Sequence, residues 1–372
     1  MAEKSVLTDV QHPLALTALP NWLRLLWQNR GVDRMYLRRA VSITALSLLT
    51  SPLRWYERLR YDAPVQQFVP AAPPIFIIGH WRSGTTHLHN LMCHDPQFGY
   101  ISTLQTIAPG IMFVGDVTLG RLFGGRAPTK RPMDEMLVSI DSPQEEEMAL
   151  ASLSPYSTYH QWWFPRHARH YFERYALMKG IRPHELRRWQ ELYRWLIQKL
   201  TVKNNGRRII LKNPSNTGRI KVLLETFPGA KFIHIYRNPY DVFSSTMHLY
   251  RKTLPAIQLQ TISEAEIEQN VLRFYDAIMR KLVAEQSMIP AGDFASVRFE
   301  NLERDPLGEM RRVYAELDLP GWETVEPAMR VYVGTLSEYQ KNTFSLAPEL
   351  VAKVNEHWRF AFEQWDYPLR NP

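Results

Sequence analysis

The sequence predicts a three-layer α/β fold, in which a central, mostly parallel sheet is flanked by helices and preceded by an N-terminal helical extension. Short apolar runs rich in β-branched residues, each typical of a buried strand, recur at residues 74–80, 207–214, 230–239 and 294–302. A helical pattern follows each run, as at residues 218–229. Strands that alternate with helices favour parallel pairing, because the chain must cross the sheet before it can add a parallel neighbour.

The N-terminal extension, residues 1–70, is predicted to lie outside the main domain of residues 71–372. Within it, residues 20–61 have a helical pattern that is interrupted at Gly31 and Pro52. The segment is basic, and its arginines are interleaved with tryptophans at Trp22, Trp27 and Trp55. Three roles are compatible with this composition: contact with a membrane surface, a wall of an apolar ligand tunnel, or an amphipathic extension packed on the core.

A long helical insert is predicted between the first two strands, at roughly residues 134–203. Its aromatic side chains either line a ligand pocket or fill the interior, and we expect most of them in the core. They are Trp162, Trp163, Phe164, Trp189 and Trp195.

Composition narrows the function classes. The single cysteine, Cys93, excludes an intramolecular disulfide and a cysteine-clustered metal site, and it favours a reducing, cytoplasmic location. The net charge of +8 suits an anionic ligand, a nucleic acid or an anionic membrane. Because the basic residues are dispersed, nucleic-acid binding is disfavoured. The first residues are polar and predict no signal peptide, and the longest apolar stretch, residues 41–50, is about half of a membrane span.

The segment GHWRSGTTHLHNLM, residues 79–92, has the pattern of an anion-binding loop. A buried strand leads into Gly79, four residues follow, and Gly84 precedes an amphipathic helix, so that successive backbone N–H groups surround an anion at the helix N-terminus. The hydroxyls of Thr85 and Thr86 add donors. Loops that bind nucleoside triphosphates carry a lysine where Thr85 stands, whereas the cation here is Arg82 inside the loop. The sequence is therefore poorly equipped for triphosphate hydrolysis.

A second anion anchor is predicted in FIHIYRNPYDVFSSTMHLY, residues 232–250. A strand delivers Arg237 at its carboxyl end, and Ser245 follows two helical turns later. An arginine can form paired, charge-assisted hydrogen bonds to one phosphate, and the serine adds a third donor. The alternative is a helix start capped by Asn238 with an arginine packed beside it.

Together these segments resemble the sulfotransferase superfamily, in particular bacterial members with an arginine in the loop and the related tyrosylprotein sulfotransferases. The resemblance covers residues 74–367 and implies a P-loop-like fold. It also implies transfer of a sulfuryl group from 3′-phosphoadenosine-5′-phosphosulfate (PAPS) to a hydroxyl or amine. The residues that it assigns to PAPS are Arg82, Ser83, Gly84, Thr85 and Thr86 at the 5′-phosphosulfate, Arg237 and Ser245 at the 3′-phosphate, and Lys341 and Asn342 in a covering loop.

In-line sulfuryl transfer needs cations at the leaving group and a base at the acceptor. Arg82 is one candidate cation. Lys212 is the other, since it ends a predicted strand at the same sheet edge. No metal site is expected in the sequence.

The general base is not fixed by the sequence. Cytosolic sulfotransferases use a histidine two residues after the lysine that ends the corresponding strand, and here that position is Pro214. Tyrosylprotein members use a glutamate in a short segment after the helix of the loop, and the comparable segment here has no carboxylate. Candidates are therefore Glu145 or Glu147 in the run DSPQEEEMAL, residues 141–150, and His80 beside the loop. The two glutamates differ by two helical positions and cannot both face one cleft; the alternative is a charged first helical turn.

Two other functions remain open at this stage: a nucleotide kinase or NTPase, and a nucleotide-binding protein without chemistry. The aromatic residues and the apolar, basic N-terminus favour a lipid-like or otherwise hydrophobic small-molecule acceptor, with peripheral membrane contact through the N-terminal helices. A protein tyrosine and a carbohydrate stay open as alternative acceptors.

Overall fold

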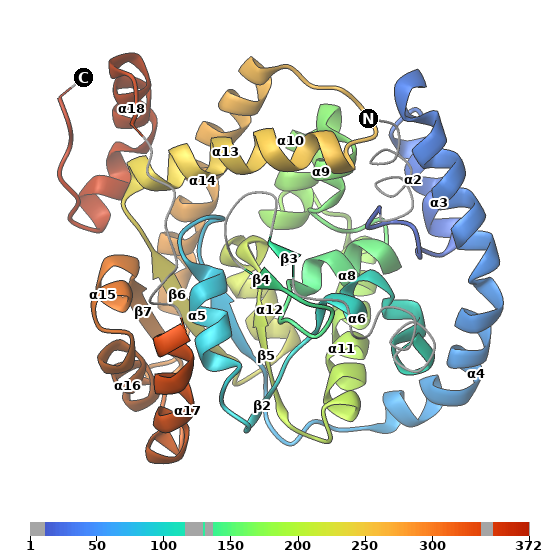
Figure 1. Cartoon of the computed structure of the whole chain (residues 1–372), viewed down its shortest axis with the longest axis horizontal. Coiled ribbons are helices and arrows are strands. Elements are labelled where there is room, and N and C mark those ends of the chain that lie inside the picture. The colour runs from blue at the N-terminus through green and yellow to red at the C-terminus, as the bar shows by residue number, and fades with distance from the viewer. Residues whose placement is uncertain (1–11, 116–128, 131–136, 336–344, 372) are drawn as a thin grey trace.

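The structure is a computed structural model that describes residues 12–115, 129–130, 137–335 and 345–371 of the 372-residue chain. Its centre is a five-stranded sheet with the order β2-β5-β1-β6-β7, in which every neighbouring pair is parallel (Figure 1). The strands are β1 Ile75–Ile78, β2 Phe98–Gly99, β5 Arg208–Lys212, β6 Lys231–Tyr236 and β7 Phe294–Arg298. The predicted parallel sheet and its four apolar strands are confirmed. The short strand β2 was not predicted, because it does not lie in an apolar run.

Helices account for most of the remaining described chain. A short antiparallel pair, β3 (Thr129–Lys130) with β4 (Leu137–Val138), stands apart from the main sheet. The helices are α2 Leu19–Gln28, α3 Leu37–Leu49, α4 Ser51–Gln67, α5 Thr85–Met92, α6 Thr103–Ile107, α8 Glu146–Leu153, α9 His160–Trp163, α10 Ala168–Tyr171, α11 Pro183–Lys203, α12 Ile220–Thr226, α13 Pro239–Ile257, α14 Glu264–Glu285, α15 Phe299–Arg304, α16 Pro306–Glu316, α17 Trp322–Thr335 and α18 Pro348–Gln364.

The sheet is buried on both faces. Along β1, Phe76 and Ile78 belong to one hydrophobic cluster, whereas Ile75 and Ile77 belong to another. Successive side chains of a strand point to opposite faces, so the alternation places one core on each side of the sheet. The smaller core packs under α5 and α15–α17, and the larger one under α8–α14, α18 and the N-terminal helices. Figure 1 shows α2–α4 and α15–α17 on opposite sides of the molecule.

The N-terminal helices are joined to this larger core. Trp22, Leu25 and Ile43 are fully buried in it. A buried ion pair of 2.5 Å joins Glu57 of α4 to Lys199 of α11. The helical run breaks at Gly31 and again just before Pro52, as expected, since α3 ends at Leu49 and α4 begins at Ser51. Pro52 lies in the first turn of α4, where its missing N–H has no intrahelical acceptor to lose. The predicted boundary near residue 70 stays a prediction.

The aromatics of the predicted insert mostly form the interior. Trp163, Phe164 and Trp189 are fully buried, and Trp162 stacks on Tyr250 at 4.3 Å between ring centroids. Their contribution is therefore packing, as the sequence indicated.

Candidate active site

The carboxyl ends of the parallel strands converge at one edge of the sheet. β1 runs into the loop that starts at Gly79, β5 ends at Lys212, and β6 ends just before Arg237. These three strands are adjacent in the sheet. Segments far apart in the sequence thus deliver their polar side chains to one place, as expected for a ligand site in an open α/β sheet.

Two glycines shape the loop between β1 and α5. A Cβ at Gly79, where φ is 147°, would lie 2.3 Å from the Ile235 carbonyl oxygen. A Cβ at Gly84, where φ is 101°, would lie 2.3 Å from the Phe299 ring. Any larger residue would push the loop off the sheet. The first backbone N–H groups of α5, beginning at Thr85 and Thr86, have no intrahelical acceptor and form the N-terminal end of the helix dipole.

Arg82 joins the two predicted anion anchors. Its backbone is left-handed, with φ of 70°, and its Nε donates a hydrogen bond of 2.8 Å to the Oγ of Ser245 on α13. The Ser83 hydroxyl donates to the His80 carbonyl oxygen at 2.8 Å and closes the loop on itself. The structure therefore brings together residues that are 163 positions apart in the chain.

Arg237 is held at the start of α13 by its neighbours. Its guanidinium lies over the Phe299 ring at 4.5 Å, and one terminal nitrogen is 3.5 Å from Asp241. The Asn238 side chain caps α13 by accepting from the Tyr240 N–H. The Arg237 Nε is buried and has no hydrogen-bond partner among the described residues. A buried N–H without an acceptor is costly, so this atom marks a position where an anionic ligand would be stabilised.

Lys212 pairs with Glu145 at the same edge. The Lys212 side chain is 2 % exposed and the Glu145 side chain 15 % exposed, and the Lys212 ammonium contacts Glu145 Oε1. Glu145 is the N-cap residue of α8. Lys212 is thus buried at this sheet edge, and Glu145 is the more accessible partner.

Glu147 points elsewhere. Both of its oxygens are engaged by Arg219, at 2.6 and 3.0 Å, and further hydrogen bonds come from Asn213, the Ser157 hydroxyl and the Thr158 N–H. Burial raises the pKa of Glu147, but the Arg219 charge and these donors outweigh burial and hold the pKa below its ordinary value. Glu145 and Glu147 therefore face different partners, as their spacing predicted.

Glu146, between them, is a buried acid that pairs with no cation among the described residues. The hydroxyl of Tyr193 donates to its Oε1 at 2.5 Å and Asn216 does so at 3.0 Å, whereas Oε2 has no partner among the described residues. Burial raises the pKa of Glu146 to about 7. Three of the side chains that contact Glu146 or Glu147 follow strand β5 and were not predicted from the sequence: Asn213, Asn216 and Arg219. Their only signal is the polar run after that strand.

His80 is turned toward the helical layer. Its ring packs edge-on against Tyr275 of α14 at 4.9 Å, and its Nδ1 lies 2.8 Å from the Trp81 carbonyl oxygen. Burial lowers the pKa of His80 to about 4. A neutral histidine packed in this way has the surroundings of a structural residue.

Glu300 of α15 accepts from the Asn238 N–H and from the Tyr367 hydroxyl, a structural arrangement. Lys341 and Asn342 lie outside the described residues. Within the described ranges, no group of three or more His, Cys, Asp or Glu side chains could hold a metal ion, and none of those helices is long and apolar enough to cross a membrane.

Comparison with known proteins gives a consistent picture. Residues 73–324 match the model of a family described as the sulfotransferase family. A relative from Mycobacterium bovis, omega-hydroxy-beta-dihydromenaquinone-9 sulfotransferase Stf3, is 34 % identical over 352 residues, which are 94 % of this chain and 90 % of the relative. The protein of the same name from Mycobacterium tuberculosis matches equally.

Solved structures share the fold. Sulfotransferase STF9 from Mycobacterium avium has a TM-score of 0.66 at 18 % identity, covering 96 % of this chain and 98 % of that one. Sulfotransferase STF1 from Mycobacterium tuberculosis has a TM-score of 0.58 at 18 % identity, covering 94 % and 92 %.

Proposed function

The chain belongs to the sulfotransferase family, and we propose that it binds PAPS at the edge formed by β1, β5 and β6 and transfers the sulfuryl group to a hydroxyl of a lipid-like acceptor. The observation that carries the proposal is the contact between Arg82 Nε and Ser245 Oγ, because it unites two anion-binding segments at one site. A ligand with phosphates at two separate positions, as in PAPS, matches such a pair.

The residues present fit PAPS. We assign the 5′-phosphosulfate to the loop of residues 79–86, where backbone N–H groups and Arg82 supply donors. Arg237 and Ser245 receive the 3′-phosphate, which would give the buried Arg237 Nε the acceptor that the protein does not supply. Lys341 and Asn342 are retained as candidates for the covering loop.

Chemistry is assigned to the Lys212–Glu145 pair. The leaving oxygen gains negative charge in the transition state, and the buried Lys212 ammonium, with Arg82, would stabilise that charge. Glu145, which is partly exposed and pairs with no cation other than Lys212 among the described residues, would accept the proton of the attacking hydroxyl. Glu147 is proposed to position the site by fixing Arg219 and Asn213, and it has no oxygen left for a substrate proton.

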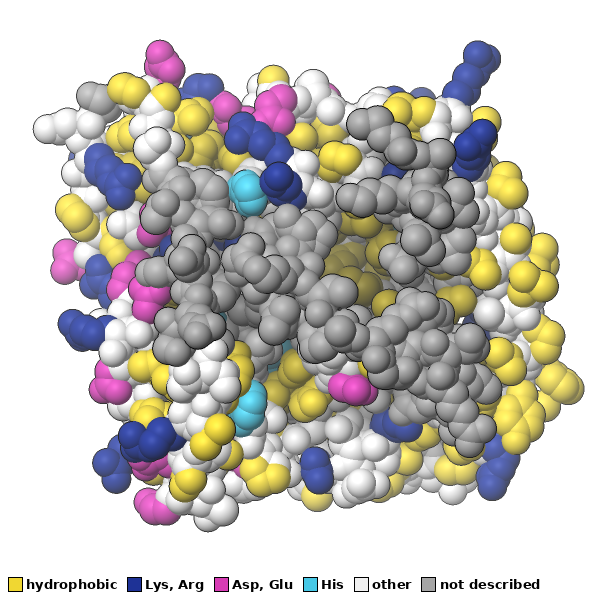
Figure 2. Space-filling model, in the orientation of Figure 1, with side chains coloured by type: hydrophobic (Ala, Val, Ile, Leu, Met, Phe, Trp, Pro, Cys, Tyr) yellow, Lys and Arg dark blue, Asp and Glu magenta, His cyan; other side chains and the backbone are white. Residues whose placement is uncertain are grey.

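A lipid-like acceptor is supported by the relatives, which are named for sulfation of a hydroxylated menaquinone. The surface of α2–α4 supports it independently. Residues 20–61 contain eight arginines and two carboxylates. Hydrophobic side chains are exposed along the same helices, and Figure 2 shows them gathered on the side of the molecule where α3 and α4 lie in Figure 1. They include Leu23, Trp27, Met35, Val41, Leu48, Leu49, Trp55 and Leu59.

An exposed apolar face rimmed by arginines complements a bilayer with anionic headgroups. We therefore propose that α2–α4 rest on an anionic membrane surface and bring the site to an acceptor dissolved in the bilayer. The inner side of the same helices packs on the core, so only their outer side is available for this contact.

The cofactor assignment is tested by calorimetric titration with adenosine 3′,5′-bisphosphate, with ADP and with ATP plus magnesium as controls. We expect metal-independent binding of the bisphosphate alone, and a loss of about 2–4 kcal/mol in Arg237→Ala. Preference for ATP with magnesium would mean that the loop serves a nucleotide kinase or NTPase.

The membrane contact is tested by flotation with vesicles of phosphatidylcholine and phosphatidylglycerol. The double variant Trp27→Ser, Trp55→Ser should float markedly less than the wild type, since these side chains are 82 % and 68 % exposed. Val331→Ser on α17, where the valine is 71 % exposed on the opposite side of the molecule, is the matched control. Equal flotation of the two variants would contradict the proposed contact between α2–α4 and the membrane.

A further inference from the structure

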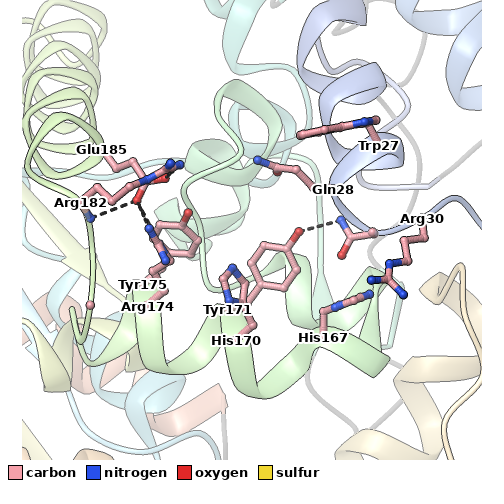
Figure 3. Close-up of a pocket in the computed structure, with 12 residues that line it drawn as sticks. Trp27, Gln28, Arg30, His167, His170, Tyr171, Arg174, Tyr175, Arg182 and Glu185 are labelled. Atoms are coloured by element: carbon pink, nitrogen blue, oxygen red, sulfur yellow. Dashed lines mark hydrogen bonds and ion pairs between the residues drawn. The ribbon is translucent and has the colours of Figure 1, made fainter.

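A cavity of about 670 Å³ lies between the end of α2, the α10 region and the start of α11. It is lined by none of the residues assigned above to PAPS or to the chemistry. Figure 3 shows Trp27, Gln28 and Arg30 of the α2 end on one side, facing His167, His170 and Tyr171 on the other. The cavity is therefore a second concave site, of a size typical for small organic ligands.

Its lining is cationic. The lining contains three arginines, Arg30, Arg174 and Arg182, and one carboxylate, Glu185, which leaves a formal excess of two positive charges with the histidines neutral. Glu185 holds Arg174 at 2.7 Å and Arg182 at 2.6 Å, as the dashed lines in Figure 3 show. Arg30 has no carboxylate partner in any ion pair recorded for the described ranges. One arginine is thus available for an anionic ligand.

The arginines also act on the two histidines of the lining, His167 and His170. Burial and then the charges of Arg30 and Arg166 lower the pKa of His167. Burial and then Arg174 and His167 lower the pKa of His170, against the opposing effect of Glu185 and Glu173. A bound anion would relieve this repulsion, and both rings could then donate to it.

Two further features orient a ligand. Arg30 has a left-handed backbone, with φ of 58°, in the turn that ends α2, and this turn carries its side chain to the His167 side of the cavity (Figure 3). Such a conformation is disfavoured for a residue with a Cβ. The Tyr171 hydroxyl accepts from the Asn29 side chain at 2.7 Å and keeps its own hydrogen for another acceptor.

One wall of the cavity is continuous with the proposed membrane surface. Trp27 lines the cavity and is also one of the exposed apolar residues of α2, next to Leu23 one turn earlier. A ligand whose anionic group enters the cavity would therefore have its apolar part beside the surface that faces the bilayer. Arginine pairs well with phosphate oxygens, because its planar fork can donate two parallel hydrogen bonds.

We propose that this cavity is a headgroup site for an anionic phospholipid, in which Arg30, His167 and His170 bind the phosphodiester while Trp27 contacts the adjoining glycerol and acyl region. The proposal rests on the membrane contact of α2–α4 and adds to it a specific lipid. It is independent of the PAPS site.

The test compares vesicles of phosphatidylcholine with vesicles that also contain phosphatidylglycerol, and uses the soluble headgroup glycerophosphoglycerol as competitor. The variant is Arg30→Gln, His170→Gln, and the matched control is Arg58→Gln. Arg58 is 80 % exposed on α4, lies outside the cavity, and its loss removes the same single charge at neutral pH. Circular dichroism and bisphosphate titration on each variant check that the fold and the PAPS site are unchanged.

We expect the cavity variant to lose at least about tenfold in partitioning to phosphatidylglycerol vesicles, and the control to lose about fivefold or less, the generic effect of one surface charge. The soluble headgroup should compete for the wild type and not for the cavity variant. Equal losses of vesicle partitioning in the two variants would mean that only surface charge matters, and this would contradict the headgroup site. If the soluble headgroup binds tightly but the cavity variant partitions to vesicles like the wild type, the ligand of the cavity is a free phosphodiester and not a membrane lipid. Either failure leaves bisphosphate binding intact, whereas failure of the proposed function abolishes it in the wild type.

Discussion

Glu145 and Glu147 differ by two positions in the chain, and their removal should have opposite consequences. Glu147→Gln cancels the charge that faces Arg219 while keeping the size of the side chain. Both members of that pair are fully buried. Replacing one partner of a buried pair leaves the other charge without compensation, which typically destabilises a protein by about 3–5 kcal/mol. The glutamine oxygen can keep part of the hydrogen bonding, so the lower end of this range is expected.

Glu145→Gln should impair turnover and destabilise the fold less than Glu147→Gln does. Glu145 is 15 % exposed, so its pair with the buried Lys212 is less completely removed from water than the fully buried pair of Glu147 with Arg219. Loss of a general base typically lowers the rate by about 10²–10⁴-fold. Binding of adenosine 3′,5′-bisphosphate should be close to that of the wild type, because Glu145 is not assigned to a phosphate.

Two measurements on each variant separate these outcomes: urea denaturation at pH 7.5, and single-turnover transfer from radiolabelled PAPS to a long-chain alcohol. The reasoning is refuted if Glu147→Gln keeps wild-type stability and loses turnover while Glu145→Gln remains fully active. Full activity in both variants would return the role of base to His80.

Three further outcomes are expected. Lys212→Ala should lower the rate of transfer by about 10²–10³-fold with bisphosphate affinity retained in calorimetry; a parallel loss of affinity would make Lys212 a binding residue only. Burial raises the pKa of Glu146 from 4.5 to about 7. Between these two pH values the native state keeps a proton that the unfolded chain releases. The free energy of unfolding of the wild type should therefore fall by about 3 kcal/mol as the pH rises from 4.5 to 7. Glu146→Gln should remove that part of the slope in urea denaturation at pH 5 and pH 8, and an unchanged slope would contradict the raised pKa. Glu57→Gln should destabilise the chain by about 3–5 kcal/mol, because Lys199 would lose its 2.5 Å partner in the interior; an unchanged denaturation midpoint would show that this ion pair does not contribute to the attachment of the N-terminal helices.

The sheet was predictable because its signal is local. Each central strand is an uninterrupted apolar run, as a strand buried on both faces must be, and the helix after it follows from residue spacing. β2 escaped prediction because Phe98 and Gly99 form too short a segment to show any period. The anion loop was predictable for a related reason: Gly79 and Gly84 are fixed by backbone geometry that only glycine tolerates, and that requirement is visible in the sequence.

The sequence by itself determined the fold class, the loop, the position of Arg237 after a strand and the residue types available for sulfuryl transfer. Only the tertiary structure decided which of them meet. Arg82 contacts Ser245, which lies 163 residues later in the chain. Arg219, a buried arginine that no local sequence pattern predicts, pairs with Glu147, whereas Glu145 pairs with Lys212. Partner choice among buried charges depends on which side chains the packing brings within a few ångströms, since each charge taken out of water must find its counterion there. The distances between these charged side chains are set by the packing of the folded chain, and no local segment of the sequence determines them.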